Sequence, residues 1–123
     1  MDTKFEDLLG KTLVEIKSDH ENIWFKTGDG EVYRQFHSQD CCEGVEVEDV
    51  IGNFDDLIGS PILLAEEIIH ENENPNGIPV KEYQDSFTWT FYKLATNKGC
   101  VTIRWYGESN GYYSESVDFE KVE

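Results

Sequence analysis

Residues 54–64 read FDDLIGSPILL, and residues 5–15 read FEDLLGKTLVE. Both stretches hold Phe, two acidic residues, two aliphatic residues and Gly in the same order. This spacing places the apolar side chains on one face of a short helical turn, which the glycine ends. A copied opening indicates a copied unit, so the sequence predicts an internal repeat made of residues 1–52 and 53–123.

Runs rich in β-branched and aromatic residues follow each opening and alternate with turn signals. The tripeptide Gly28-Asp29-Gly30, for example, is typical of a tight hairpin turn. The polar segment 70–79 is predicted to be an inserted surface loop. Strands are predicted at residues 12–17, 23–27, 31–36 and 45–50 of the first half and at 61–69, 86–96, 100–106 and 113–122 of the second.

The chain of 123 residues has the length of a single domain with one core. Its predicted fold class is α+β and mainly antiparallel β. Each half would contribute one helical turn and four strands, which are too few to bury an apolar face alone. We therefore expect two tandem units packed with pseudo-twofold symmetry, as a sandwich or a barrel-like fold.

The composition is strongly acidic, because 26 Asp and Glu against 10 Lys and Arg give a net charge of −16. Nucleic acids and anionic membranes are therefore poor direct partners. Two interpretations of the charge stay open: a solvated surface that keeps the protein soluble, and a structured face that mimics a nucleic-acid backbone toward a basic protein. No apolar run approaches the roughly 20 residues that cross a bilayer. The three cysteines form no disulfide framework, so a cytoplasmic location is expected.

His37, Asp40, Cys41, Cys42 and Glu43 bring metal-capable side chains close together in the sequence. His37, Cys41 and Cys42 are candidate zinc ligands, although the paired spacing of a closed zinc site is absent. The alternative is a turn in which one cysteine is buried and Asp40 bonds local amides. A nucleophilic cysteine with His37 as its base is disfavoured, because the neighbouring acids would raise the thiol pKa. We therefore predict no enzymatic activity and no other cofactor.

Residues 105–115, WYGESNGYYSE, combine aromatic side chains with Asn, Ser and Gly, as recognition loops do. The alternative is a rim where aromatic residues cover the core. In the repeat this loop is equivalent to the 37–43 cluster, so the two would line one composite cleft or two similar ones. Arg34 and Arg104, at equivalent positions, would hold an anionic ligand or bridge nearby acids. The predicted binding residues are Arg34, His37, Asp40, Glu43, Arg104, Trp105, Tyr106, Asn110, Tyr112 and Tyr113.

Three stretches carry a family resemblance: HSQDCCE at 37–43, EDVIGNFDDLIGSPIL at 48–63 and TIRWYGESNGYYS at 102–114. They resemble a family of small, acidic, uncharacterised proteins found largely in phages and prophages. The resemblance spans nearly the whole chain and implies a context rather than a chemistry. In that context, a small acidic phage accessory protein acts by binding a host component.

The favoured hypothesis is a non-enzymatic interaction protein, a phage-derived accessory or defence-interfering factor that binds the basic surface of a host protein. Formation of a homodimer also stays open. The alternative is a protein that binds or sequesters a small anionic ligand or nucleotide. A weaker alternative is a metal-binding protein.

Overall fold

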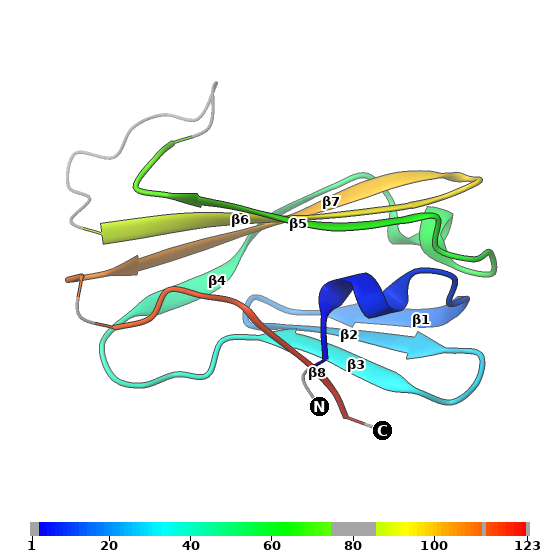
Figure 1. The fold of residues 1–123 in the computed structure, drawn as a ribbon, viewed down its shortest axis with the longest axis horizontal. Helices are drawn as coiled ribbons and strands as arrows, with labels where there is room; N and C mark the ends of the chain where they lie inside the picture. Colours follow the sequence, from blue (N-terminus) through cyan, green and yellow to red (C-terminus); the bar gives the residue numbers. More distant parts are fainter. Residues whose placement is uncertain (1–2, 75–85, 112, 123) are drawn as a thin grey trace.

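The computed structural model describes residues 3–74, 86–111 and 113–122 and consists mainly of antiparallel β-strands (Figure 1). Two four-stranded sheets, ordered β1-β2-β3-β8 and β4-β7-β6-β5, lie in separate layers. Within the described ranges the helical structure is limited to two 3-10 turns, and the sheets do not close into a barrel. The elements are η1 (Phe5–Leu8), β1 (Leu13–Ser18), β2 (Asn22–Thr27), β3 (Val32–Phe36), β4 (Gly44–Ile51), η2 (Phe54–Leu57), β5 (Leu64–Glu71), β6 (Ser86–Thr96), β7 (Gly99–Ser109) and β8 (Asp118–Lys121).

The fourth strand of each half pairs with the sheet of the other half. Strand β4 pairs with β7, where Val45 lies opposite Gly107, and β8 pairs with β3, where Glu120 lies opposite Arg34. All of the strand pairs are antiparallel. Neither half therefore forms a complete sheet without a strand from the other, a connection that the sequence pattern did not predict.

The core lies between the two sheets and follows from the alternation of apolar residues along the strands. In β2, Ile23 and Phe25 are fully buried, whereas Lys26 between Phe25 and Thr27 is exposed. In β6, Tyr92 and Leu94 join the same core. Successive side chains of a strand point to opposite faces, so one face of each sheet supplies this core.

A second, smaller apolar cluster lies outside the main core. It consists of Phe87, Trp89 and Tyr106, with Phe91 packed against it. Trp89 and Tyr106 have ring centroids 4.5 Å apart. Phe87, Trp89 and Phe91 alternate with Thr88, Thr90 and Tyr92 along β6, so one face of the strand contributes to this cluster and the other to the main core.

Several predicted boundaries differ from the structure. Strand β7 continues through Ser109, so Gly107 and Glu108 are strand residues rather than the start of a loop. The last strand covers only Asp118–Lys121 of the predicted 113–122. The predicted 70–79 loop overlaps the end of β5, and its residues from 75 onward lie outside the described ranges.

Strand β7 extends because it is a central strand with a partner on each side. Gly107 pairs with Val45 of β4 and with Thr88 of β6, so its backbone is held in the sheet although glycine has a low β propensity.

No helix in the described residues has the length and apolar character of a membrane-spanning segment.

Candidate functional site

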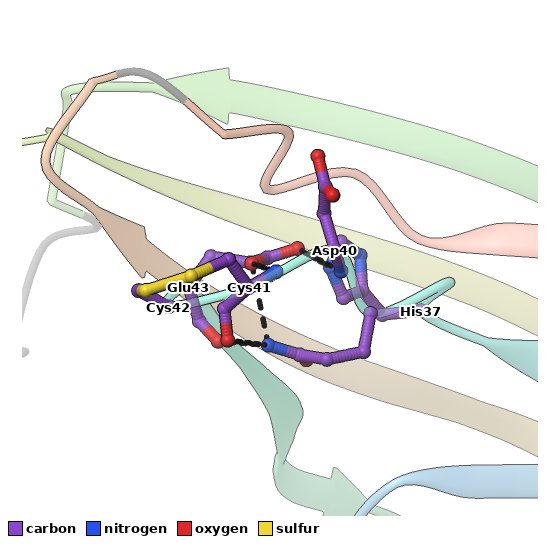
Figure 2. The surroundings of a disulfide bond; sticks show 6 residues. His37, Asp40, Cys41, Cys42 and Glu43 are labelled. Carbon is purple, nitrogen blue, oxygen red and sulfur yellow. Dashed lines mark hydrogen bonds and ion pairs between the residues drawn. A yellow bond between two sulfur atoms is a disulfide. The ribbon is translucent and has the colours of Figure 1, made fainter.

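The loop between β3 and β4 folds around the carboxylate of Glu43. The backbone amides of Asp40 and Cys41 each donate to this carboxylate at 2.9 Å, and the Gln39 side chain donates at 3.2 Å (Figure 2). The side chain of Glu43 is fully buried. The Cys41 amide, followed by the His37 ring, lowers the pKa of the Glu43 carboxyl from its ordinary 4.5 to about 2. Glu43 therefore holds the loop as an ionised acceptor.

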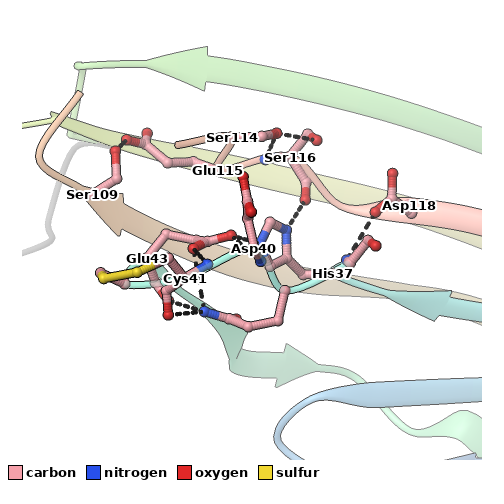
Figure 3. A network of polar contacts seen from close by, with 12 residues as sticks. His37, Asp40, Cys41, Glu43, Ser109, Ser114, Glu115, Ser116 and Asp118 are labelled. Atoms are coloured by element: carbon pink, nitrogen blue, oxygen red, sulfur yellow. Dashed lines mark hydrogen bonds and ion pairs between the residues drawn. A yellow bond between two sulfur atoms is a disulfide. The ribbon is translucent and has the colours of Figure 1, made fainter. Parts of the chain in front are cut away.

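His37 joins this loop to the segment 113–117 that precedes β8. Its Nε2 lies 2.7 Å from Glu43 Oε2, and its Nδ1 lies 2.7 Å from the carbonyl oxygen of Ser116 (Figure 3). The ring of His37 thus bridges a carboxylate of its own loop and a backbone carbonyl of the segment before β8. The Ser38 amide adds a bond to Asp118 Oδ2 at 3.0 Å. The 37–43 loop is therefore in direct contact with residues 116 and 118, just beyond the predicted 105–115 loop.

The adjacent cysteines do not present free thiols. Cys41 Sγ and Cys42 Sγ are joined in a disulfide, and both residues are exposed (Figure 2). A single bond between neighbouring residues is not a disulfide framework, and in this form neither cysteine supplies a thiolate to the candidate metal site with His37. Cys100 is free and exposed. Over the described residues, no group of three or more His, Cys, Asp and Glu side chains has the arrangement of a metal site.

Segment 113–117 is also held by a buried carboxylate, that of Glu115. Thr88 Oγ1 donates to Glu115 Oε1 at 2.8 Å, and Ser109 Oγ donates to Glu115 Oε2 (Figure 3). Glu115 is 9% exposed. Both segments of the candidate site, 37–43 and 113–117, are thus fixed by one buried glutamate each.

Two cavities flank these segments. The first, which we call the β5 cavity, has a volume of about 480 Å³ and lies between β5, β6 and residues 113–117. Its carboxylates are Glu67, Glu71 and Glu115. The second, the loop cavity, has a volume of about 500 Å³ and lies beside the 37–43 loop. Its carboxylates are Glu21, Glu43, Glu46 and Glu108. Among the residues that the structure describes, no Lys or Arg lines either cavity.

The predicted arginines lie in separate ion pairs and line neither cavity. Arg34 Nη1 lies 3.6 Å from Glu120 Oε1, on the sheet that contains β3 and β8. Arg104 Nε lies 2.5 Å from Glu48 Oε2, and its Nη2 lies 3.6 Å from Asp49 Oδ2. The structure therefore favours the bridging role for both arginines over a shared anion site.

The predicted aromatic loop is divided between the core and the two cavities. Trp105 is 1% exposed and belongs to the main core, which corrects its assignment to a recognition surface. Tyr106 lines the loop cavity, and Tyr113 lines the β5 cavity. Asn110 is exposed beyond the end of β7, and Tyr112 lies outside the described residues.

Glu67 and Glu71, which line the β5 cavity, are not among the residues that the sequence pattern predicted for the site. The signal that could have found them is the alternation along residues 65–71, which places Ala65, Glu67, Ile69 and Glu71 on one face. Ala65 is buried in the core, so the carboxylates that share its face point toward the interior side of the sheet. Acidic residues on the strand face that carries a buried residue indicate a candidate site even in a chain with many acids.

The depressed pKa of Glu43 predicts a loss of stability in acid. A carboxyl with a lower pKa in the folded state contributes stability above pH 4.5, and this contribution is lost as the pH falls toward 2. Lys11 and Lys121 lower the pKa of Glu31 to about 2 as well, so the wild type has two contributors in this window. Urea denaturation between pH 6 and about 2.5, followed by tryptophan fluorescence, should show a shallower decline for Glu43→Gln. Equal slopes for wild type and variant would contradict the assignment.

The comparisons with known proteins identify a family and nothing closer. Residues 6–119 match the model of a domain of unknown function, DUF7448. Searches of curated proteins and of solved structures found no match. The match covers both sheets and both cavities, from η1 to β8. The chain therefore belongs to the DUF7448 family.

Proposed function

We propose that this protein is a non-enzymatic interaction protein whose acidic surface binds a basic surface of another protein. The observation that carries the proposal is the lining of the two cavities, which combines carboxylates with hydroxyl groups and includes no described Lys or Arg. Such a lining favours cationic side chains and repels phosphates and carboxylates. Mimicry of a nucleic-acid backbone is the form of this proposal that the net charge of −16 supports.

The state of the cations supports a basic partner over a small anionic ligand. Lys11, Lys121, Arg34 and Arg104 are all in ion pairs with carboxylates of this chain. Arg104 has only 13% of its side chain exposed. An anionic ligand would have to compete with these carboxylates for either arginine.

We further infer that the chain is a duplicated unit, with the fourth strand exchanged between the halves. Equivalent residues make equivalent contacts: Gly10 N donates to Ile62 O, and Gly59 N donates to Leu13 O, both at 2.8 Å. The ion pairs of Arg34 with Glu120 and of Arg104 with Glu48 also correspond in the two halves. These reciprocal contacts support a pseudo-twofold axis between the two openings.

The family resemblance suggests the setting of the interaction. Within this proposal the protein is made by a phage or prophage, acts in the cytoplasm of the host, and binds a basic host protein. Direct contact with nucleic acid or with membranes is not part of it, because both are anionic.

Capture from a bacterial lysate tests the proposal. The immobilised protein should retain a basic protein at about 0.05 M salt and release most of it by about 0.5 M, since screening shortens the range of electrostatic attraction. An unrelated acidic protein of similar net charge serves as the control for unspecific capture. The retained protein, identified by mass spectrometry, is then purified and its binding measured by calorimetry. A partner without a basic surface, or one bound equally tightly at high salt, would contradict the proposal.

A further inference from the structure

We infer that the basic partner binds as an extended segment that adds to the free edge of β5 and places its cationic side chains against the carboxylates of the β5 cavity. The inference rests on the proposed function, because it names the surface and the conformation by which a basic partner is recognised. It is carried by three observations: the free edge of β5, the groove beneath it and the charge along it.

Strand β5 is the last strand of its sheet. One of its edges pairs with β6, and the opposite edge has no partner strand among the described residues. The Asn72 amide donates to Phe87 O at 2.7 Å, and Asn72 follows directly on the registered pair of Glu71 with Thr88. Antiparallel pairs alternate between bonded and non-bonded positions, so Ala65, Glu67, Ile69 and Glu71 direct their amides and carbonyls away from β6. These groups are a template for one further strand.

The side chains of three of these four residues reach the β5 cavity. Glu67, Ile69 and Glu71 all line it, and Ile69 is 52% exposed. In Figure 1 the chain leading to β8, drawn in orange to red, runs below β5, and residues 113–117 of it form the opposite wall. Backbone acceptors, an exposed aliphatic side chain and carboxylates thus lie together along one half of β5.

The cavity continues toward η1. A neighbouring cavity of about 440 Å³ shares Glu67 and Val117 with it and adds the carboxylates of Glu6 and Asp118 together with the amine of Lys4. Glu67 accepts a hydrogen bond from the Tyr92 hydroxyl at 2.7 Å, which fixes its position between the two cavities. The β5 cavity itself is the groove that follows the strand, because Glu67, Ile69 and Glu71 line it in turn, and this length accommodates several residues of an extended chain.

The charge along β5 selects the occupant. The strand carries Glu66, Glu67 and Glu71 and no Lys or Arg among its 8 residues. Pairing of β5 with the same strand of a second copy would bring the three glutamates of each strand close to those of the other, which is unfavourable. A segment that alternates basic with β-branched residues places cations on the groove and satisfies the free backbone groups, so the partner is a basic extended segment.

The test uses a short fluorescein-labelled peptide that alternates arginine with valine and threonine, measured by fluorescence anisotropy against the whole protein. The variant Ile69→Pro removes an outward amide while leaving the bonds to β6 in place, since proline is tolerated at an outward position of an edge strand. We expect at least about tenfold weaker binding for this variant, from the lost hydrogen bond and the blocked edge. The control Ile69→Val keeps the amide and should bind like the wild type.

A second pair of variants tests the charge without touching the backbone. Glu71→Gln should weaken peptide binding about threefold, whereas Glu15→Gln on β1 should leave it unchanged. Equal weakening by both would show general attraction to the acidic surface and would overturn the inference. Unchanged binding by Ile69→Pro, with its circular dichroism spectrum matching the wild type, would overturn it too. If Ile69→Pro does not fold, the pair of charge variants decides.

Binding of the partner captured from the lysate distinguishes a failure of this inference from a failure of the proposed function. A basic partner that binds the wild type and Ile69→Pro equally well leaves the proposed function standing and overturns the edge site. Failure to retain any basic partner contradicts the proposed function itself. A dimer in sedimentation experiments that Ile69→Pro converts to monomer would assign the edge to a second copy and overturn the inference.

Discussion

Replacing Trp105 with Phe is expected to lower the free energy of unfolding by about 3 kcal/mol. Trp105 is 1% exposed in the main core, and its Nε1 donates to Gln35 Oε1 at 3.1 Å. Phenylalanine leaves a void where the indole was and removes the donor for a fully buried amide oxygen. The lost hydrogen bond adds to the cost of the void, because the side chain of Gln35 is fully buried and water cannot replace the indole donor.

Gln35 provides the internal control for this prediction. Its Nε2 has no hydrogen-bond partner in the described structure, so the side chain is only half satisfied. Changing it to Leu as well as Trp105 to Phe removes both buried polar groups, and we expect the double variant to be about 1 kcal/mol more stable than Trp105→Phe alone. Urea denaturation of the wild type, of the single variants Trp105→Phe and Gln35→Leu, and of the double variant gives the complete double-mutant cycle. A cost below about 1 kcal/mol for Trp105→Phe would contradict the core role.

Trp105 also shows where the sequence analysis reached its limit. Aromatic residues beside Asn, Ser and Gly are typical of recognition loops, but the same letters form a central strand when partners exist on both sides. The partner on one side is β4, which comes from the other half of the chain. A local pattern does not contain that pairing, so Trp105 was placed on a surface although it lies in the core.

Most strands could be predicted because their apolar residues alternate. The helical turns at Phe5–Leu8 and Phe54–Leu57 lie where the two similar sequence stretches predicted them. What remained out of reach depends on contacts between distant segments: the exchange of β4 and β8, the bond between His37 and Ser116, and the pairing of both arginines. The role of Glu43 was also hidden, since a buried and an exposed glutamate look alike in a sequence with 26 acids.

The two candidate regions lie next to β4 and β8, the strands that pair with strands from the other half of the chain. The 37–43 loop ends where β4 joins the second sheet, and segment 113–117 ends where β8 joins the first. Each region therefore lies at a crossing between the sheets, where backbone is not covered by a neighbouring strand. Buried carboxylates satisfy the amides and hydroxyls at both crossings, so acidity has a structural role there in addition to any role in binding.

Gly107 of β7 lies close to Glu115 of segment 113–117 and to Val45 of β4. Its replacement by Ala is expected to destabilise the protein by about 3 kcal/mol. A Cβ at this position would lie 2.8 Å from the carbonyl oxygen of Glu115 and 3.2 Å from a methyl group of Val45. Backbone on one side and a packed strand on the other leave little room to adjust. Thermal unfolding followed by circular dichroism measures the effect.

Gly44 supplies the matched control, because it is also a strand glycine and pairs with Glu108, the residue after Gly107. A Cβ at Gly44 would meet no heavy atom within 4 Å, so Gly44→Ala should change the stability by no more than about 0.5 kcal/mol. Displacing Glu115 also moves one wall of the β5 cavity, so Gly107→Ala should weaken binding of the basic peptide while Gly44→Ala leaves it intact. Equal stability of the two variants would mean that segment 113–117 does not pack against β7 as described.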